Sequence, residues 1–126
     1  ESESAGYIAK HCNAKIIIAE DFHQIGKFIQ VIDQLTECGA FVVYRTISDS
    51  DLEQSRKYKP TYRWDEFLKI SDNDKSLDDA LESRISSQRP GNICSLIYTS
   101  GTTGVPKATM VSHDAINFMT SHLGEI

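Results

Sequence analysis

The sequence predicts an α/β fold, in which a layered βαβ unit is followed by a strand–loop–strand element. Short runs of β-branched and aromatic residues alternate with stretches whose apolar residues recur every three or four positions. A segment rich in glycine and hydroxyl side chains separates two of the later β-type runs. The length of 126 residues, with 40% hydrophobic and 25% charged residues, is typical of one globular domain.

The first two elements are a helix and a strand. Apolar residues at helical spacing predict a helix over residues 7–12, beginning close to the start of the chain without a clear cap. Residues 15–19 contain three consecutive isoleucines between polar neighbours, a run too short for a helix. We therefore expect a strand there that is buried on both faces.

The next segment predicts the helix and second strand of the βαβ unit. Asp21 is a favourable N-cap, and Gln24 three residues later completes a capping-box pattern. Apolar residues then recur at helical spacing, which predicts a helix ending near Glu37 with Gly39 just beyond it. Residues 40–45 read as the second strand, joined to the first by a right-handed crossover.

The middle of the chain carries weaker signals. Residues 47–63 are polar and charged and include Pro60, so we expect a surface loop. Trp64, Phe67 and Leu68 restore helical spacing and predict a short helix of packing residues.

Residues 71–75 then read as a solvated loop, and residues 89–92 as a turn. Between them a helix is predicted to start at a Ser76 cap, with Asp79 in the capping-box position. Its apolar face carries Leu77, Leu81 and Ile85.

The last elements flank the glycine-rich segment. Residues 93–98 are nearly all apolar and predict a central strand, and residues 108–111 predict a fourth strand. Ser112 can cap a final helix whose apolar face carries Ile116, Met119 and Leu123.

Charge and cysteine usage narrow the class of protein. The formal net charge of −5 argues against a nucleic-acid binder, which needs a basic face. No apolar run approaches the length of a membrane-spanning helix, and no charged-then-apolar leader opens the sequence. Cys12, Cys38 and Cys94 are odd in number and widely spaced, so we expect reduced, intracellular core cysteines.

The segment 98–107 is the strongest candidate for a functional site. Gly101 and Gly104 allow positive φ and the close approach of a ligand, and Lys107 adds a positive charge. Four hydroxyl donors accompany them: Thr99, Ser100, Thr102 and Thr103. Backbone amides, hydroxyls and one lysine suit phosphate oxygens. The pattern is neither a Walker A loop nor a dinucleotide fingerprint, and an ordinary glycine- and threonine-rich hairpin loop is the alternative.

The string T-S-G-T-T-G-V-P-K resembles the phosphate-loop signature of the adenylate-forming (AMP-binding) superfamily. The flanks agree, with a strand before it and Met110-Val111-Ser112-His113 after it. Upstream, residues 7–21 are similar to the family's helix–strand unit, and Trp64-Asp65-Glu66-Phe67 to a short helix. Tyr98 and Ser112-His113-Asp114 look most like long-chain acyl-CoA synthetases of the bubblegum type.

This resemblance implies that residues 1–126 are an internal fragment of the AMP-binding N-terminal domain of a longer enzyme. Such enzymes convert a fatty acid and ATP into an acyl-adenylate and pyrophosphate, and then transfer the acyl group to coenzyme A with release of AMP. The resemblance places the loop on the β- and γ-phosphates, with Lys107 as the catalytic clamp. The remaining phosphate-binding residues would be Thr99, Ser100, Gly101, Thr102, Thr103, Gly104, Val105 and Pro106. The cofactors would be ATP, Mg²⁺ and coenzyme A, with the Mg²⁺ ligand outside this chain.

The resemblance further implies a ligase of lipid metabolism in the cytoplasm or at the cytoplasmic face of the endoplasmic reticulum, with peripheral membrane association. The isolated fragment is expected to be inactive and marginally stable. Ala108 stands where the family usually has glycine. Three alternatives remain: another acid–CoA ligase or adenylation domain, a non-catalytic nucleotide-binding fragment, and a purely structural piece.

The remaining polar residues predict no second site. His113 is expected to close the junction between strand and helix. His11, His23 and His122 lack a second metal ligand at a suitable spacing, and the acidic stretch 72–79 reads as a solvated face.

Overall fold

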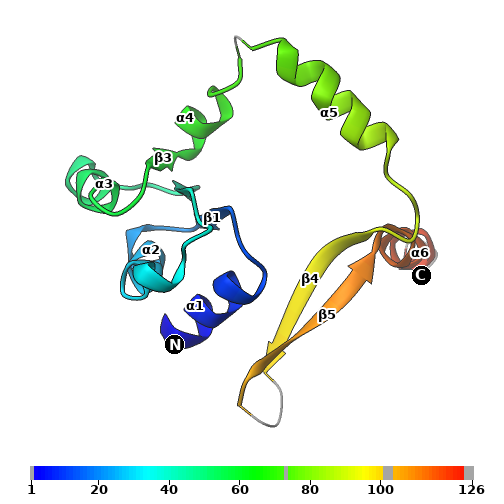
Figure 1. The fold of residues 1–126 in the computed structure, drawn as a ribbon, viewed down its shortest axis with the longest axis horizontal. Coiled ribbons are helices and arrows are strands. Elements are labelled where there is room, and N and C mark those ends of the chain that lie inside the picture. The colour runs from blue at the N-terminus through cyan, green and yellow to red at the C-terminus, as the bar shows by residue number, and fades with distance from the viewer. Residues whose placement is uncertain (1, 73, 101–103, 124–126) are drawn as a thin grey trace. The chain divides into compact units, whose positions relative to one another are not determined.

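The computed structural model describes residues 2–72, 74–100 and 104–123, and it divides the chain into two compact units. Residues 1–73 form the first unit and residues 74–126 the second (Figure 1). Each unit is described by itself below.

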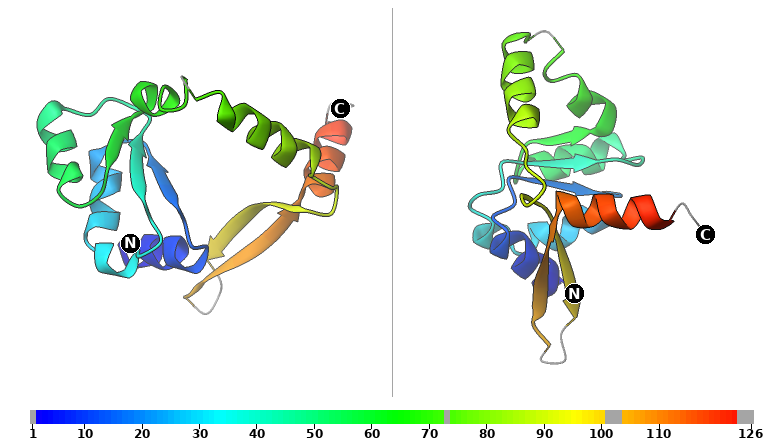
Figure 2. Two further views of the ribbon diagram at one scale, coloured as in Figure 1. Left: turned by 45° about the horizontal axis from the view of Figure 1, so that its top comes forward. Right: turned by 90° about the vertical axis from the view of Figure 1, so that its right-hand side faces the viewer.

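The first unit contains a three-stranded parallel sheet in the order β1-β2-β3. Its elements in chain order are α1 (Ser2–His11), β1 (Ile16–Ala19), α2 (Phe22–Ile29), the 3₁₀ helix η1 (Ile32–Gln34), β2 (Ala40–Val43), α3 (Asp49–Arg56), β3 (Thr61–Arg63) and α4 (Trp64–Leu68). The parallel pairing of β1 with β2 across α2 confirms the predicted βαβ unit. A further helix, α3, connects β2 to β3 in the same way (Figures 1 and 2).

The core lies between the sheet and the helices α1, α2 and α3. From the sheet it takes Ile17, Ala19, Phe41 and Val43, and from the helices Ala9, Ile25 and Leu52. Val42 is also fully buried, but it lies on the opposite face of the sheet. Its neighbour in register, Tyr62, contacts the ring of Phe67 in α4 with ring centroids 6.5 Å apart. The short helix α4, predicted from the sequence, therefore covers part of this second face.

The prediction that the isoleucine strand is buried on both faces is wrong. In β1 only Ile17 and Ala19 are buried, whereas Ile16 and Ile18 are 44% and 51% exposed. Successive side chains of a strand point to opposite faces. The helices cover one face of β1, and within the described part of this unit no element buries the other.

The second helix begins as predicted but ends early. Asp21 is the N-cap, and its Oδ1 accepts a hydrogen bond from the Gln24 amide at 2.9 Å. The helix ends at Ile29 rather than near Glu37, and the chain continues through η1. The apolar periodicity misleads here, because Val31 and Ile32 pack against the core from the turn and η1 that follow α2.

The prediction of a surface loop over residues 47–63 is also wrong, because this segment forms α3 and β3. Ser48 caps α3 by accepting the Asp51 amide at 3.1 Å. The buried surface of α3 is narrow, and Leu52 and Ser55 are its buried residues. Ser55 hydrogen-bonds Thr61 of β3 through their hydroxyl oxygens at 2.7 Å. A polar buried contact of this kind leaves no apolar pattern in the sequence.

The second unit contains α5 (Ser76–Ser86), β4 (Ile93–Ser100), β5 (Pro106–Ser112) and α6 (His113–Leu123). Ser76 is the first residue of α5 rather than its cap, and its amide donates to Asp74 Oδ1 at 3.1 Å. Ser112 does cap α6, since its hydroxyl accepts the Ala115 amide at 3.2 Å. Strand β4 is not central in the described structure, because it pairs with β5 alone, and Ile93, Leu96 and Ile97 are exposed.

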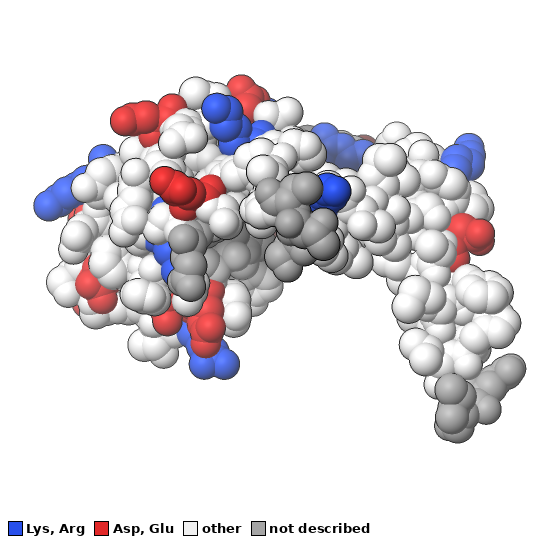
Figure 3. Space-filling view, turned by 90° about the horizontal axis from the view of Figure 1, so that it is seen from below, with Lys and Arg blue, Asp and Glu red and all other residues white. Residues whose placement is uncertain are grey.

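Cysteine and charge placement complete the description of the surface. All three cysteines are free thiols, as expected, but only Cys38 is buried. Cys12 and Cys94 are exposed, so the prediction of core cysteines is wrong for these two. In the view of Figure 3, acidic and basic side chains are interspersed over the face rather than gathered by sign.

Candidate functional site

The described ends of the glycine- and hydroxyl-rich segment belong to an antiparallel hairpin formed by β4 and β5 (Figures 1 and 2). Ser100 pairs with Pro106 as the last described rung. Gly104 has a φ of 81°, in the region where glycine is favoured over other residues. A Cβ at this position would meet no atom within 4 Å among the described residues, so the backbone conformation rather than space requires glycine.

Three of the predicted site residues, Gly101, Thr102 and Thr103, lie outside the described residues, as does the Ser100 side chain. The predictions for them remain untested. The structure does describe the two residues that enter and leave the hairpin tip on the same rung, Thr99 and Lys107.

Thr99 and Lys107 are direct cross-strand partners. Side chains of directly opposed residues in an antiparallel pair lie on the same face, with Cβ atoms about 5 Å apart. Both residues are exposed. Within residues 2–72, 74–100 and 104–123, neither side chain has a hydrogen bond or ion pair. A hydroxyl donor and an ammonium group thus lie together beside the loop, available to an anionic ligand.

The opposite face of the hairpin near the tip is apolar. Tyr98 pairs with Ala108, and Leu96 pairs with Met110. The hairpin therefore presents one face with a hydroxyl and a charge, and one face with aromatic and aliphatic side chains. Val105 is exposed at the tip, and Pro106 begins β5.

The base of the hairpin is joined to the turn that precedes it. The His113 amide donates to the Asn92 carbonyl oxygen at 3.1 Å, and the Asp114 amide donates to the Pro90 carbonyl oxygen at 2.9 Å. His113 Nε2 also lies 3.2 Å from Gln88 Oε1. These contacts confirm that His113 closes the strand–helix junction, and the turn over residues 89–92 is confirmed as well.

The other histidines lie on helices. His23 and His122 occupy α2 and α6, and the ring of His11 stacks on Tyr7 with ring centroids 5.6 Å apart. Across the described residues, no three His, Cys, Asp or Glu side chains are grouped so that they could hold a metal ion.

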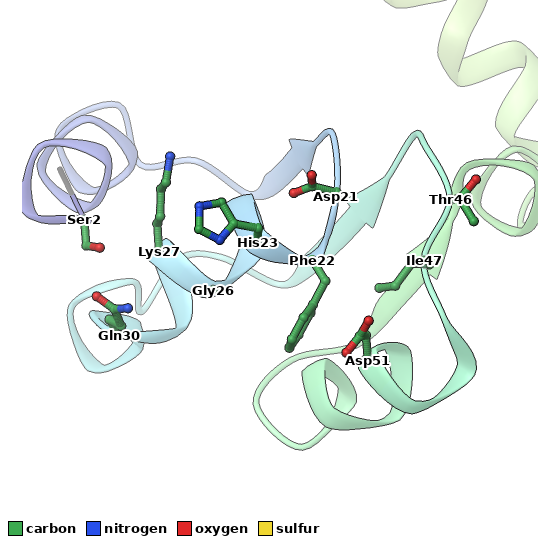
Figure 4. A pocket seen from close by; sticks show the side chains of 10 residues that line it. All are labelled: Ser2, Asp21, Phe22, His23, Gly26, Lys27, Gln30, Thr46, Ile47 and Asp51. Atoms are coloured by element: carbon green, nitrogen blue, oxygen red, sulfur yellow. The ribbon is translucent and has the colours of Figure 1, made fainter.

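The first unit contains a pocket of about 660 Å³ that was not predicted from the sequence (Figure 4). It lies where β1 and β2 end, and its lining includes Asp21, His23 and Lys27. The Asp21 carboxylate is engaged as the cap of α2, and Lys27 Nζ donates to Gln24 Oε1 at 2.6 Å. The signal for it in the sequence is the placement of Asp21 and Ile47 after two strands of a βαβ unit, because ligands often bind at the carboxyl ends of parallel strands.

Shifted pKa values are described for three groups, Cys38, Glu37 and Arg63, all of which lie in the first unit. Burial raises the pKa of the Cys38 thiol. A hydrogen bond from Lys15 lowers the pKa of Glu37. The hydrogen bond to Asp49 raises the pKa of Arg63. These shifts reflect packing and surface pairing and mark no reactive centre.

The fold and the hairpin together define an α/β protein with a glycine- and hydroxyl-rich loop suited to phosphate. The chain belongs to the AMP-binding enzyme family, whose model matches residues 1–125. It is 39% identical to the long-chain-fatty-acid–CoA ligase ACSBG2 of Xenopus laevis over 98% of this chain and 16% of that protein. It is 34% identical to ACSBG2 of Gallus gallus, over 97% of this chain and 15% of that protein. The human ligase ACSBG1 is 33% identical over 92% of this chain and 15% of its own length.

The relatives named above confirm the resemblance to the bubblegum type. The chain spans about 16% of the length of these curated relatives. No helix in the described part of the chain is long and apolar enough to cross a membrane.

Proposed function

We propose that residues 1–126 are the phosphate-loop segment of the AMP-binding domain of a long-chain-fatty-acid–CoA ligase. The observation that carries this proposal is the Thr99–Lys107 rung beside the glycine-rich loop, in a chain that belongs to the AMP-binding family. The names of the relatives reported above supply the substrate class, a long-chain fatty acid joined to coenzyme A.

The reaction has two steps. In the first, a carboxylate oxygen of the fatty acid attacks the α-phosphorus of ATP, the P–O bond to the β-phosphate breaks, and pyrophosphate leaves. In the second, the thiol of coenzyme A attacks the acyl carbonyl carbon, AMP leaves, and the thiol proton passes to solvent. Negative charge builds up on the departing pyrophosphate during the first step.

The hairpin residues suit this first step. Lys107 contributes an ammonium group, and Thr99 contributes a hydroxyl donor on the same face. Preorganised donors aimed at developing charge are usually a leading catalytic contribution at such sites. Ser100, Gly101, Thr102, Thr103, Gly104, Val105 and Pro106 complete the proposed binding loop.

Mg²⁺ does not fit the residues of the hairpin. Neither β4 nor β5 contains an aspartate or glutamate, and Mg²⁺ is usually held by one or two carboxylates together with substrate phosphates. No step of the proposal therefore runs through a metal held by this chain.

Replacement of Lys107 in the full-length protein tests the proposal. In Lys107→Ala we expect fatty-acid-dependent ATP–pyrophosphate exchange to fall about 100- to 1,000-fold, the usual effect of removing one such donor. Lys107→Arg keeps the charge and should retain part of the activity. Lys69→Ala, at an exposed lysine on the end of α4, is the matched control and should leave the rate unchanged. Full exchange activity in Lys107→Ala would contradict the proposed role.

The acyl substrate is tested separately. The proposal predicts that the full-length protein forms acyl-CoA from palmitate faster than from coumarate, whereas an aryl-CoA ligase would show the reverse preference.

The same proposal includes a cytoplasmic location with peripheral membrane association. Fractionation of cells that express the full-length protein tests this location, and recovery from a luminal compartment would contradict it.

A further inference from the structure

The hairpin that carries the candidate site contains a one-residue offset near its base. Ile93 pairs with Ser112, but the next rung joins Ser95 to Val111. Cys94 has no partner in the ladder, so β4 has one residue more than β5 between these two rungs. This arrangement is a β-bulge, a feature that is over-represented next to active sites, where it redirects side chains.

The offset decides which residue of β4 lies opposite Lys107. With a regular ladder continued from the Ile93–Ser112 rung, Cys94 would face Val111 and Tyr98 would face Lys107. With Cys94 bulged, Thr99 faces Lys107 instead, and Tyr98 faces Ala108. Because side chains alternate between faces, a shift of one residue exchanges the hydroxyl of Thr99 for the ring of Tyr98.

The contacts at the base hold the ladder below the bulge. The hydrogen bond from the His113 amide to the Asn92 carbonyl extends the register of the Ile93–Ser112 rung. The bond from the Asp114 amide to the Pro90 carbonyl also ties the start of α6 to the turn. The extra residue of β4 is therefore accommodated above this junction, where Cys94 Sγ lies 3.3 Å from the Val111 carbonyl oxygen.

We propose that the bulge at Cys94 sets the register of the hairpin and thereby positions the Thr99 hydroxyl beside Lys107 for the pyrophosphate of the nucleotide. Cys94 acts through the strand pairing and is a positioning residue. The phosphate role rests on the proposed function, whereas the register does not.

A pair of insertions in the full-length protein tests the proposal. One alanine inserted after Cys94 lengthens β4 by one residue. With the base held in place and only Cys94 bulged, the inserted alanine pairs with Val111 and Tyr98 moves opposite Lys107. A second alanine inserted between Val111 and Ser112 pairs with the first, so Ser95 faces Val111 again and Thr99 returns to its place. The doubly inserted protein is the matched control, because its hairpin is longer by one regular rung.

Cysteine cross-linking reads the register directly. Two double-cysteine variants are prepared, Thr99→Cys/Lys107→Cys and Tyr98→Cys/Lys107→Cys. Each variant is oxidised, and the linked peptides are identified by mass spectrometry. We expect the 99–107 link in the otherwise unchanged protein and in the double insertion, and the 98–107 link in the single insertion.

The effect on activity is measured separately, in proteins that keep Thr99 and Lys107. The single insertion should reduce ATP–pyrophosphate exchange about 10- to 100-fold, as for loss of one hydrogen bond to a charged group. The double insertion should restore the rate.

Three results would overturn the proposal. The first is a 98–107 link in the otherwise unchanged protein. The second is a 99–107 link in the single insertion, which would show that the loop rather than the bulge sets the register. The third is normal exchange by the single insertion with Thr99 and Lys107 intact, when the cysteine variant of the same insertion forms the 98–107 link. If the single insertion does not fold, the double insertion decides. A 99–107 link in its cysteine variant, together with full exchange when Thr99 and Lys107 are intact, supports the proposal. A 98–107 link in the double insertion overturns it. A full-length protein without any exchange activity would contradict the proposed function and leave the register result standing.

Discussion

Among single residues, Cys38 couples the stability of the first unit to pH. Its side chain is buried at 3% exposure, and its Sγ lies 3.5 Å from the Ala40 carbonyl oxygen. Burial raises the pKa of the thiol above its ordinary value of 9.0 because the thiolate is poorly solvated in the core. In an unfolded chain the same thiol ionises at its ordinary pKa.

The free energy of unfolding should therefore fall as the pH rises above about 9 and should continue to fall until the pH reaches the raised pKa of the folded state. Below pH 9 this contribution is fully present. In Cys38→Ala the free energy of unfolding should fall less at alkaline pH than it does in the unchanged chain. In Cys12→Ala, where the replaced thiol is exposed, the fall should be the same as in the unchanged chain. Urea unfolding midpoints between pH 7 and 10 measure the difference. Equal slopes in all three proteins would contradict the assignment.

Surface charges contribute in a different way. Lys15 pairs with Glu37 and lowers the pKa of that carboxyl, and Arg63 pairs with Asp49 at 2.5 Å and with Glu66 at 3.2 Å. These groups are largely in contact with water, so added salt screens their interactions. They join neighbouring segments of the first unit at its surface.

At the scale of elements, the packing of α1 against the segment after α2 depends on a close approach at Gly6. Gly6 is buried, and a Cβ built on it would lie 2.6 Å from Val31 Cγ2. A β-branched valine has little freedom to move away. The same contact explains why Val31 belongs to the packed core although it lies beyond the end of α2.

Replacement of Gly6 by alanine should destabilise the protein by up to about 2 kcal/mol, because the typical overpacking cost of about 1–3 kcal/mol is reduced by the roughly 1 kcal/mol of helix propensity that alanine gains inside α1. Gly26→Ala is the matched control, because Gly26 lies inside α2 and a Cβ there meets nothing within 4 Å. This second change should stabilise the protein by up to about 1 kcal/mol through helix propensity. Thermal or urea unfolding measures both effects. A Gly6→Ala that stabilises the protein as much as Gly26→Ala does would show that the contact is looser than described.

At the scale of the whole molecule, the two units differ in how much apolar surface they bury. The first unit has a core that includes Ile25, Phe41 and Val43 at 0% exposure. Among residues 74–100 and 104–123, no side chain is buried to that degree, and Leu81, Met110 and Phe118 are 57%, 70% and 63% exposed. Exposed apolar surface of this extent is typical of a face that another chain segment or partner covers.

The isolated 126-residue chain should therefore show uneven protection in hydrogen exchange. Amides of β1 and β2 should exchange through cooperative unfolding, whereas amides of α5 and α6 should exchange close to the unprotected rate. Exchange followed by mass spectrometry at low protein concentration measures this, and sedimentation at rising concentration detects self-association through the exposed surface. Equal protection of both units in a monomeric chain would contradict this expectation.

The local features could all be predicted from the order of the residues: the βαβ unit, the cap at Asp21, the two strands around the glycine-rich loop and the membership of the AMP-binding family. These depend on residue type and short-range spacing, both of which the sequence displays directly. Only the tertiary structure showed that residues 47–63 contribute a helix and a third parallel strand, and that the bulge at Cys94 places Thr99 opposite Lys107. Both depend on hydrogen bonds between residues distant in the chain, and these leave no periodic pattern in the sequence.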